Sequence, residues 1–281
     1  MSYIGGFVPE FYEKSISFRS ILAQRCIQQL GYLVQWKQSG GDSVVDIGCG
    51  AGDTTKECFY PLIPRTYSRL VCLDISAEML EAAKENFSQV PRVDFFQLDI
   101  GSPISEVKKK ELGSFDHIFS SFCLSYVKDQ KQAFKNIFDM LNSGGDILMA
   151  LHAITPPIEI LFRMAESPRW KDKFVKINDF YPYPYRKDTN PQKTLEELLK
   201  SSGFTDVNVT KNDSYETFKS VEFLRDFMMG LPLCDMVSEE EKAEFYEDQV
   251  KIGLEMNVVA EHINGEPPLR RILHIYARKP I

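Results

Sequence analysis

A glycine-dense turn with an acid on each side is the segment of this chain best suited to bind a ligand. Residues 43 to 47 have the β-branched composition of a buried strand, and Gly48 and Gly50 follow them directly. Glycine lets the backbone bend sharply and approach a ligand closely. Asp46 precedes this turn and Asp53 follows it. We interpret the segment as a strand that leads into a ligand-binding loop.

Acids also close the next two predicted strands. The apolar run 69 to 73 ends at Asp74, and the run 93 to 98 ends at Asp99. In an open α/β sheet the ligand crevice lies beyond the carboxyl ends of the strands. The sequence therefore predicts three carboxylates along one edge of the sheet.

The surroundings of the glycines favour one nucleotide cofactor over another. A nicotinamide loop reads Gly-x-Gly-x-x-Gly and presents helix amides to a pyrophosphate, which two flanking carboxylates would repel. The acids suit a ligand with an ammonium and a sulfonium, and Asp74 is placed to accept two ribose hydroxyls. The pattern predicts S-adenosylmethionine. The structural alternative is a glycine turn with three acids on ordinary solvated loops.

Length and composition limit the class of protein. The chain has 281 residues, 43% hydrophobic, which suits one large α/β domain with inserts. No apolar run approaches the roughly 20 residues of a membrane span, and no leader pattern is present, so we expect a soluble cytoplasmic protein. The net charge of −7 argues against nucleic acid and favours a small-molecule substrate. No oligomer is indicated.

Cysteine and histidine spacing predicts neither disulfides nor a metal. The six cysteines form no Cys-x-x-Cys pair and mostly fall in apolar stretches, as small core residues of a reducing compartment do. The four histidines lack metal-ligand spacing. The cysteines are Cys26, Cys49, Cys58, Cys72, Cys123 and Cys234, and the histidines are His117, His152, His262 and His274.

Strands and helices alternate through the first half of the chain, which predicts a doubly wound, Rossmann-like parallel sheet. An amphipathic helix over about 15 to 38 precedes it, and Asn142 to Gly145 has the composition of a turn before the fifth strand. The expected strands are 43 to 47, 69 to 73, 93 to 98, 115 to 121 and 146 to 151. The expected helices start at about 52, 77 and 129, with a charged segment at 103 to 111.

Two inserts interrupt this rhythm. Residues 154 to 190 are rich in aromatics and proline, include Trp170, and could form a lid; residues 211 to 266 have helical spacing. Core packing is the alternative for their aromatic side chains. We expect one domain whose core is about 40 to 153, 191 to 210 and 268 to 281, with a helix at 192 to 201 and strands at 204 to 210 and 271 to 278.

The ordered motifs resemble the seven-stranded class I methyltransferases and, over nearly the full length, the insect juvenile hormone acid O-methyltransferases. The resemblance lies in Tyr12 to Ser15, Trp36-Lys37, Asp74 to Met79, Phe115 to Ser120, Asp129 to Phe138, Gly203-Phe204 and Tyr276 to Lys279. It implies a seven-stranded sheet and methyl transfer from S-adenosylmethionine to the carboxylate of a sesquiterpenoid acid such as farnesoic acid. The cofactor residues it implies, with the acid before the turn, are Asp46, Gly48, Gly50, Asp74, Ile75, Met79, Asp99, Ile100 and Ser120.

The sequence departs from this family at the acceptor side. Leu124-Ser125-Tyr126 stands where the family commonly has Leu-His-Trp, and Arg19 stands where it tends to have Gln. Arg19 can form a bidentate pair with a carboxylate, which Gln cannot. We predict that Arg19 and Tyr126 orient the acid and that Ser125 and Trp170 contact it. The structural alternatives are a solvated helix residue for Arg19 and a strand-end cap for Tyr126.

An ionised acid needs no general base, so the predicted work of the enzyme is to orient the reactants in a dry pocket. Two rival functions stay open. One is transfer to another acceptor, such as a different acid, a phenol or an amine. The other is a non-catalytic isoprenoid-binding protein, in which the changes at Arg19, Ser125 and Tyr126 have ended transfer.

Overall fold

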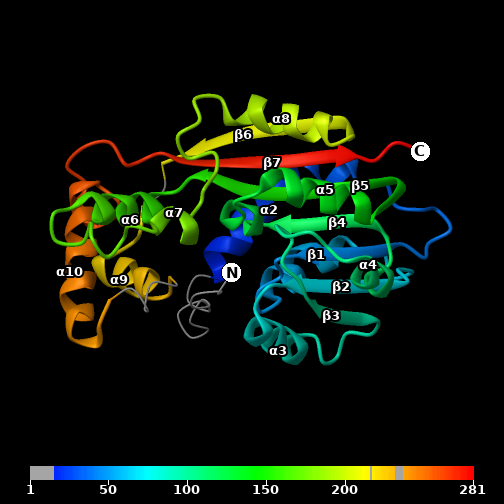
Figure 1. The fold of residues 1–281 in the computed structure, drawn as a ribbon, viewed down its shortest axis with the longest axis horizontal. Helices are drawn as coiled ribbons and strands as arrows, with labels where there is room; N and C mark the ends of the chain where they lie inside the picture. Colours follow the sequence, from blue (N-terminus) through cyan, green and yellow to red (C-terminus); the bar gives the residue numbers. More distant parts are fainter. Residues whose placement is uncertain (1–15, 216, 232–236) are drawn as a thin grey trace.

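A mixed seven-stranded sheet with helices on both faces forms the centre of the molecule (Figure 1). The computed structural model describes residues 16–215, 217–231 and 237–281. The strands are β1 (Ser43–Ile47), β2 (Arg69–Asp74), β3 (Val93–Gln97), β4 (Phe115–Ser121), β5 (Leu141–Ile154), β6 (Thr205–Ser214) and β7 (Arg270–Arg278). Their order in the sheet is β3-β2-β1-β4-β5-β7-β6. The expected doubly wound arrangement is confirmed for β1 to β5, which pair in parallel, whereas β7 is antiparallel to both β5 and β6.

The helices divide into those that flank the sheet and those that belong to the inserts. The first group comprises α2 (Ile16–Leu30), α3 (Ala77–Asn86), α4 (Glu106–Leu112), α5 (Gln130–Met140) and α8 (Pro191–Ser201). The second comprises α6 (Pro156–Glu166), α7 (Ile177–Phe180), α9 (Val221–Met229) and α10 (Glu239–Glu255). Figure 1 shows the second group together beyond the end of the sheet toward which the arrowheads of β4 and β5 point.

Alternation along the strands gives the sheet two apolar faces. Val45 faces the cluster that includes Phe134 of α5 and Leu195 of α8, while its neighbour Val44 faces the cluster that includes Leu22 of α2. Successive side chains of a strand point to opposite faces, so a strand covered on both sides must be apolar throughout. This explains why β1 and β2 read as largely apolar runs in the sequence.

The inserts have an apolar core of their own. Trp170, Phe174 and Phe245 pack there, with ring centroids of Phe174 and Phe245 5.5 Å apart, and Leu224 of α9 joins them. Helix α10 starts at a capping box formed by Ser238 and Glu241. The two inserts therefore fold together, although about twenty residues of core chain and a strand separate them in sequence.

Three helical predictions change in the structure. The first helix ends at Leu30 and one 3-10 turn (Gly31–Leu33) follows, so it is shorter than the predicted 15 to 38. Its predicted first residue, Ser15, lies outside the described residues. After the glycine turn, a short π-helical segment (Thr55–Phe59) and a 3-10 turn (Tyr60–Leu62) replace a longer helix, because Pro61 cannot donate a helical hydrogen bond. The charged segment 103 to 111 is largely helix α4.

The expected turn at 142 to 145 is wrong, since β5 runs through it. Partners of β4 jump from Leu141 to Asp146, so these residues form a bulge in the strand. Gly144 has a φ of 79°, and the side chain of Asn142 donates to Asp116 at 2.9 Å. Gly144 and this hydrogen bond thus belong to a bulge inside the sheet, where the sequence predicted a turn outside it.

Among the described residues, no helix combines the length and the apolar character needed to cross a bilayer. The cytoplasmic location stays a prediction.

Candidate active site

The glycine turn after β1 is held tightly against β2 and β4. The amides of Gly48 and Cys49 both donate to the carbonyl of Leu73, at 2.7 and 3.0 Å. Gly48 has a φ of 73°, and a Cβ built there would lie 2.2 Å from the Cβ of Cys123. Gly50 also has a positive φ, of 56°. The turn therefore requires glycine for its conformation and, at Gly48, for space.

Asp46 lies under this turn and is almost fully buried, at 2% exposure. Its Oδ2 accepts a hydrogen bond of 2.5 Å from Thr55, while Oδ1 has no partner in the part of the chain that the structure describes. Burial raises the pKa of Asp46 to about 7, against the hydrogen bond from Thr55, and the negative charge of Asp74 adds to the rise. A cation bound beside these two acids would relieve both effects.

Asp74 joins the turn to the end of β2. Its Oδ2 accepts from the amide of Gly50 at 2.8 Å, and its Oδ1 accepts from the amide of Ser76 at 2.9 Å. Burial raises its pKa in spite of these bonds. Ile75 is 40% exposed, whereas Met79 is 4% exposed at the start of α3. Asp74 thus has a structural role whether or not a ribose also binds to it.

The third acid is the most open of the three. Asp99 is exposed, and it accepts hydrogen bonds from Gly101 N at 2.9 Å and Ser102 Oγ at 2.7 Å. Ile100, next to it, is buried, and its carbonyl accepts from the side chain of Asn136 at 2.8 Å. Asn136 of α5 was not singled out from the sequence, because only the fold brings it to the loop after β3.

Ser120 ties the neighbouring strand to the turn. Its side chain is fully buried, and its hydroxyl donates to the carbonyl of Ile47 at 2.7 Å. The predicted cofactor residues from β1, β2 and β4 are therefore linked through direct hydrogen bonds. The hydroxyl of Ser120 thus has an internal role, and its contact with the cofactor stays a prediction.

Tyr126 lies in the segment after β4, where the charge of Arg19 acts on it. Cys123 contacts the turn at Gly48, and Tyr126 closes the same 3-10 segment, η4 (Cys123–Tyr126). Burial raises the pKa of Tyr126, and the hydrogen bond from Tyr183 and the positive charge of Arg19 both oppose the rise. The hydroxyl of Tyr183 donates to that of Tyr126 at 3.4 Å. Two phenols from separate segments thus contact each other, and the charge of Arg19, on a third segment, acts on Tyr126.

The other two predicted acceptor residues have internal roles. Ser125 is fully buried, and its Oγ accepts from the amide of His152 at 2.8 Å, which ties η4 to β5. Trp170 is 2% exposed, donates from Nε1 to Asp248 at 2.8 Å, and packs edge-on against Phe245. Both residues thus have hydrogen-bonding or packing roles within the fold, and their contact with a substrate stays a prediction.

His152 is a candidate that sequence reasoning missed. Its ring stacks on that of Phe122 with centroids 4.3 Å apart, and its Nδ1 is buried without a partner among the described residues. Burial lowers its pKa to about 3, and the charge of Arg270, which is 2% exposed, lowers it further. The imidazole is therefore neutral near pH 7. The pairing of β5 with β7 that brings Arg270 here leaves no local sequence signal.

Within the described ranges, no three histidine, cysteine or acidic side chains are arranged to hold a metal ion. The described cysteines are free thiols, and Cys234 lies outside the described residues.

Comparison with known proteins relates this site to a family. Residues 45–147 match the family model described as a methyltransferase domain. The chain is 27% identical to the juvenile hormone acid O-methyltransferase of Bombyx mori over 276 residues, 96% of each chain. It is also 27% identical to the Drosophila melanogaster protein of that name over 262 residues, 92% of this chain and 87% of that one.

A solved structure supports the same fold. Phosphoethanolamine N-methyltransferase 2 of Haemonchus contortus, in complex with S-adenosyl-L-methionine, aligns with a TM-score of 0.52 at 19% identity. The alignment covers 92% of this chain and 52% of that one, so this chain spans about half of its length.

Proposed function

Because this chain carries a class I methyltransferase domain and resembles juvenile hormone acid O-methyltransferases over nearly its whole length, we propose that it esterifies a hydrophobic carboxylic acid. The methyl donor is S-adenosylmethionine, and the acceptor is an acid of the sesquiterpenoid kind. One observation supports this most directly. The segment η4 contacts the glycine turn at Gly48 and ends at Tyr126, and the positive charge of Arg19 acts on Tyr126.

The donor fits the residues at the turn. Asp46 offers a buried carboxylate oxygen without a partner among the described residues, and Asp74 adds a second negative charge. Two such acids suit a cation better than a phosphate. Gly48 and Gly50 leave room that a Cβ would fill or strain. Asp74, Asp99 and the backbone near Ile75 would hold the nucleoside, and the bound donor would supply an electrophilic methyl group.

In this proposal, side chains of this protein bind and orient the acceptor acid. An aliphatic acid has a pKa of about 4 to 5, so it reaches the site ionised and needs no base. Arg19 attracts the carboxylate, and Tyr126 and Tyr183 can donate hydrogen bonds to it. The neutral His152 neither adds a competing charge nor takes a proton. These residues orient one carboxylate oxygen toward the methyl group.

Burial around Tyr126 favours transfer. The positive donor and the negative acid give neutral products, so charge disperses toward the transition state and water would stabilise the reactants more. Aromatic side chains of Tyr181 and Tyr183 flank the Tyr126 ring, with centroids 6.0 and 5.4 Å away. Holding well-placed reactants in the right orientation can lower the activation barrier by about 7 to 11 kcal/mol.

In this proposal the chain is one methyltransferase core with two inserts, and the inserts form the acceptor side.

A transfer assay tests the proposal. Tritium transfer from labelled S-adenosylmethionine to farnesoic acid, to a fatty acid and to a phenol should give product only with the acids. At saturating S-adenosylmethionine the rate should be flat above about pH 6, because the acid is already ionised, whereas a phenol or amine acceptor gives a rate that rises through about pH 7 to 10. Absence of donor binding, or transfer only to phenols, would contradict the proposal.

A further inference from the structure

His152 of β5 contacts the segment that joins the glycine turn to the acceptor side. Its ring stacks on Phe122, which directly precedes η4, with centroids 4.3 Å apart and planes 16° apart. Its backbone amide donates to Ser125 Oγ, within η4, at 2.8 Å. Between these two contacts, Cys123 packs against Gly48 of the glycine turn. His152 therefore touches η4 on both sides of the residue that meets the donor turn.

The residue on which His152 stacks has a strained backbone. Phe122 has a φ of 64°, in the left-handed region that bulky side chains rarely adopt. Its amide donates to the carbonyl of Ala150 at 2.7 Å, and its side chain is buried. Such strain persists only where the surrounding contacts hold it, and it gathers at functional sites. The stack on His152 is one of the contacts that hold Phe122.

His152 faces the same side of the sheet as helix α2. Its partner on β7 is Ile272, and cross-strand partners share a face of the sheet. Ile272 belongs to the apolar cluster that contains Leu22 of α2. Arg19 lies three positions before Leu22, so both side chains lie on the same side of the helix. His152 and Arg19 therefore lie on the same side of the sheet.

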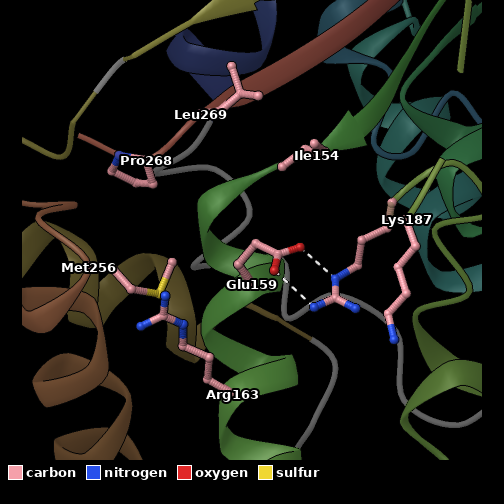
Figure 2. A pocket seen from close by; sticks show the side chains of 8 residues that line it. Ile154, Glu159, Arg163, Lys187, Met256, Pro268 and Leu269 are labelled. Atoms are coloured by element: carbon pink, nitrogen blue, oxygen red, sulfur yellow. Dashed lines mark hydrogen bonds and ion pairs between the residues drawn. The ribbon is translucent and has the colours of Figure 1, made fainter. Parts of the chain in front are cut away.

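Tyr183, the second phenol of the acceptor cluster, is anchored near the same strand. Its carbonyl accepts from the amide of Arg186 at 2.9 Å, and the Arg186 guanidinium bonds twice to Glu159, at 2.5 and 2.9 Å. Figure 2 shows Glu159 on α6, the helix that follows β5. The positive charge of Arg270, which is buried, acts on both Tyr183 and His152. His152 thus belongs to the polar surroundings of the acceptor cluster.

The imidazole of His152 has hydrogen-bonding capacity that the fold does not use. Among the described residues, neither ring nitrogen has a hydrogen-bond partner. Nδ1 is buried, so Nε2 is the nitrogen open to a ligand in this half-buried residue. Burial lowers the pKa to about 3, so the ring is neutral and has one N–H. That proton belongs on Nε2, because a buried N–H at Nδ1 would have no acceptor.

We propose that His152 contacts the substrate and that the Nε2–H of its neutral imidazole donates a hydrogen bond to the carboxylate of the acceptor acid. The inference rests on the proposed function in that the acceptor is an ionised acid. A carboxylate has about four lone-pair sites, so it accepts from His152 and Tyr126 while it pairs with Arg19. An uncharged donor orients the acid without the ground-state stabilisation that a second ion pair would add.

Calorimetry in the presence of S-adenosylhomocysteine tests the contact without turnover. His152→Phe keeps a ring to stack on Phe122 and removes the N–H, so decanoate should bind roughly tenfold more weakly. Methyl decanoate, which has no charge, should lose less than about threefold. His274→Phe, which removes a buried imidazole from the neighbouring strand β7, is the matched control and should bind decanoate like wild type. Wild-type affinity for decanoate in His152→Phe would refute the contact.

Nuclear magnetic resonance of the wild type, with nitrogen-15 in its histidines, tests the proton position without any substitution at His152. The ring should be neutral and protonated at Nε2 near pH 7. Its Nε2–H signal should shift when decanoate is added to saturation. A ring protonated at Nδ1, or an Nε2–H signal that decanoate leaves unchanged, would overturn the inference.

Kinetics separate this inference from the proposed function. In His152→Phe, the KM for an acid acceptor should rise roughly tenfold, with the KM for S-adenosylmethionine unchanged. If wild type methylates acids and His152→Phe matches His274→Phe in decanoate binding and KM, the inference is refuted and the function stands. If His152→Phe loses decanoate binding but no acid is ever methylated, His152 binds a carboxylate and the proposed function fails.

Discussion

The protonation state of Asp46 is expected to make cofactor binding depend on pH. It is buried beneath the glycine turn, and its pKa is raised to about 7 by burial and by the nearby charge of Asp74. Below that pH the carboxyl is neutral and attracts a sulfonium weakly. Above it the carboxylate is charged and binds the cation more strongly. The sulfonium charge does not titrate, and the α-amino group, with a pKa of about 8, is common to S-adenosylmethionine and S-adenosylhomocysteine, so the difference between their pH profiles reports the pairing of Asp46 with the sulfonium.

We predict that the affinity for S-adenosylmethionine rises several-fold between pH 5.5 and 8, while the affinity for S-adenosylhomocysteine, which lacks the sulfonium, rises less. Calorimetric titration at several pH values measures both. Asp46→Asn should bind the donor more weakly and with a flat pH profile. A wild-type profile as flat as that of the variant would show that Asp46 does not sense the donor.

Arg19 is the second residue whose role can be isolated. Its charge acts on Tyr126, and it lies on α2. Arg19→Ala should raise the KM for an acid acceptor roughly tenfold, because one charge-assisted pair to the carboxylate is lost. Donor affinity should stay unchanged. Arg25→Ala on the same helix is the control. If the two variants have the same KM for the acid, Arg19 does not bind the carboxylate.

At the scale of elements, the insert that follows β5 combines a packed part with a more open part. Helix α6 is largely buried against α9 and α10, whereas the segment around α7 contains several exposed residues. Tyr181 and Tyr183 of this segment reach the ring of Tyr126. The segment therefore links the acceptor cluster to the surface.

We predict that residues 154 to 190 gain hydrogen-exchange protection when S-adenosylhomocysteine and an acid are both bound, chiefly in peptides that include Tyr181 and Tyr183. Local ordering over the site lowers amide exchange. Peptides from α8 (Pro191–Ser201), which packs on the sheet, serve as the internal control and should not change. Unchanged exchange in 154 to 190 would make this insert a static wall.

At the scale of the whole molecule, a buried histidine links the strands at the edge opposite the glycine turn. His117 of β4 lies 2.7 Å from Asp146 of β5 and 3.0 Å from Asp42 before β1. The ring of Trp36 covers it at a centroid distance of 4.2 Å. Burial lowers the pKa of His117, but the hydrogen bonds and charges of Asp146 and Asp42 outweigh this and raise it. The imidazole thus links three segments, and its raised pKa favours the charged form.

A raised folded pKa gives stability that is fully present below the unfolded value of 6.5 and is lost as pH rises through the folded value. We therefore predict that the Tm of the wild type falls from pH 6.5 to 9 more steeply than that of His117→Gln, measured by thermal denaturation. His262→Gln, at an exposed histidine, should follow the wild type. Parallel curves for wild type and His117→Gln would mean that the imidazole is not charged in the fold.

Local patterns in the sequence determined the parallel half of the sheet and the cofactor edge. Val44, Val45 and Ile47 specify a buried strand. At position 48 a Cβ atom would collide with Cys123, so glycine is required there. Such features depend on neighbours in the chain, so residue type and spacing were enough to predict them. Strand β4 has the predicted bounds, residues 115 to 121.

Only the tertiary structure decided which polar side chains face one another at the acceptor side. The charge of Arg270 acts on His152 because β5 pairs with β7 across more than a hundred residues of chain, and the charge of Arg19 on α2 acts on Tyr126. Trp170, which we predicted to contact the substrate, donates a hydrogen bond to Asp248 and packs against Phe245. Long-range pairing and burial set these contacts, and the spacing of residues along one chain does not encode them locally.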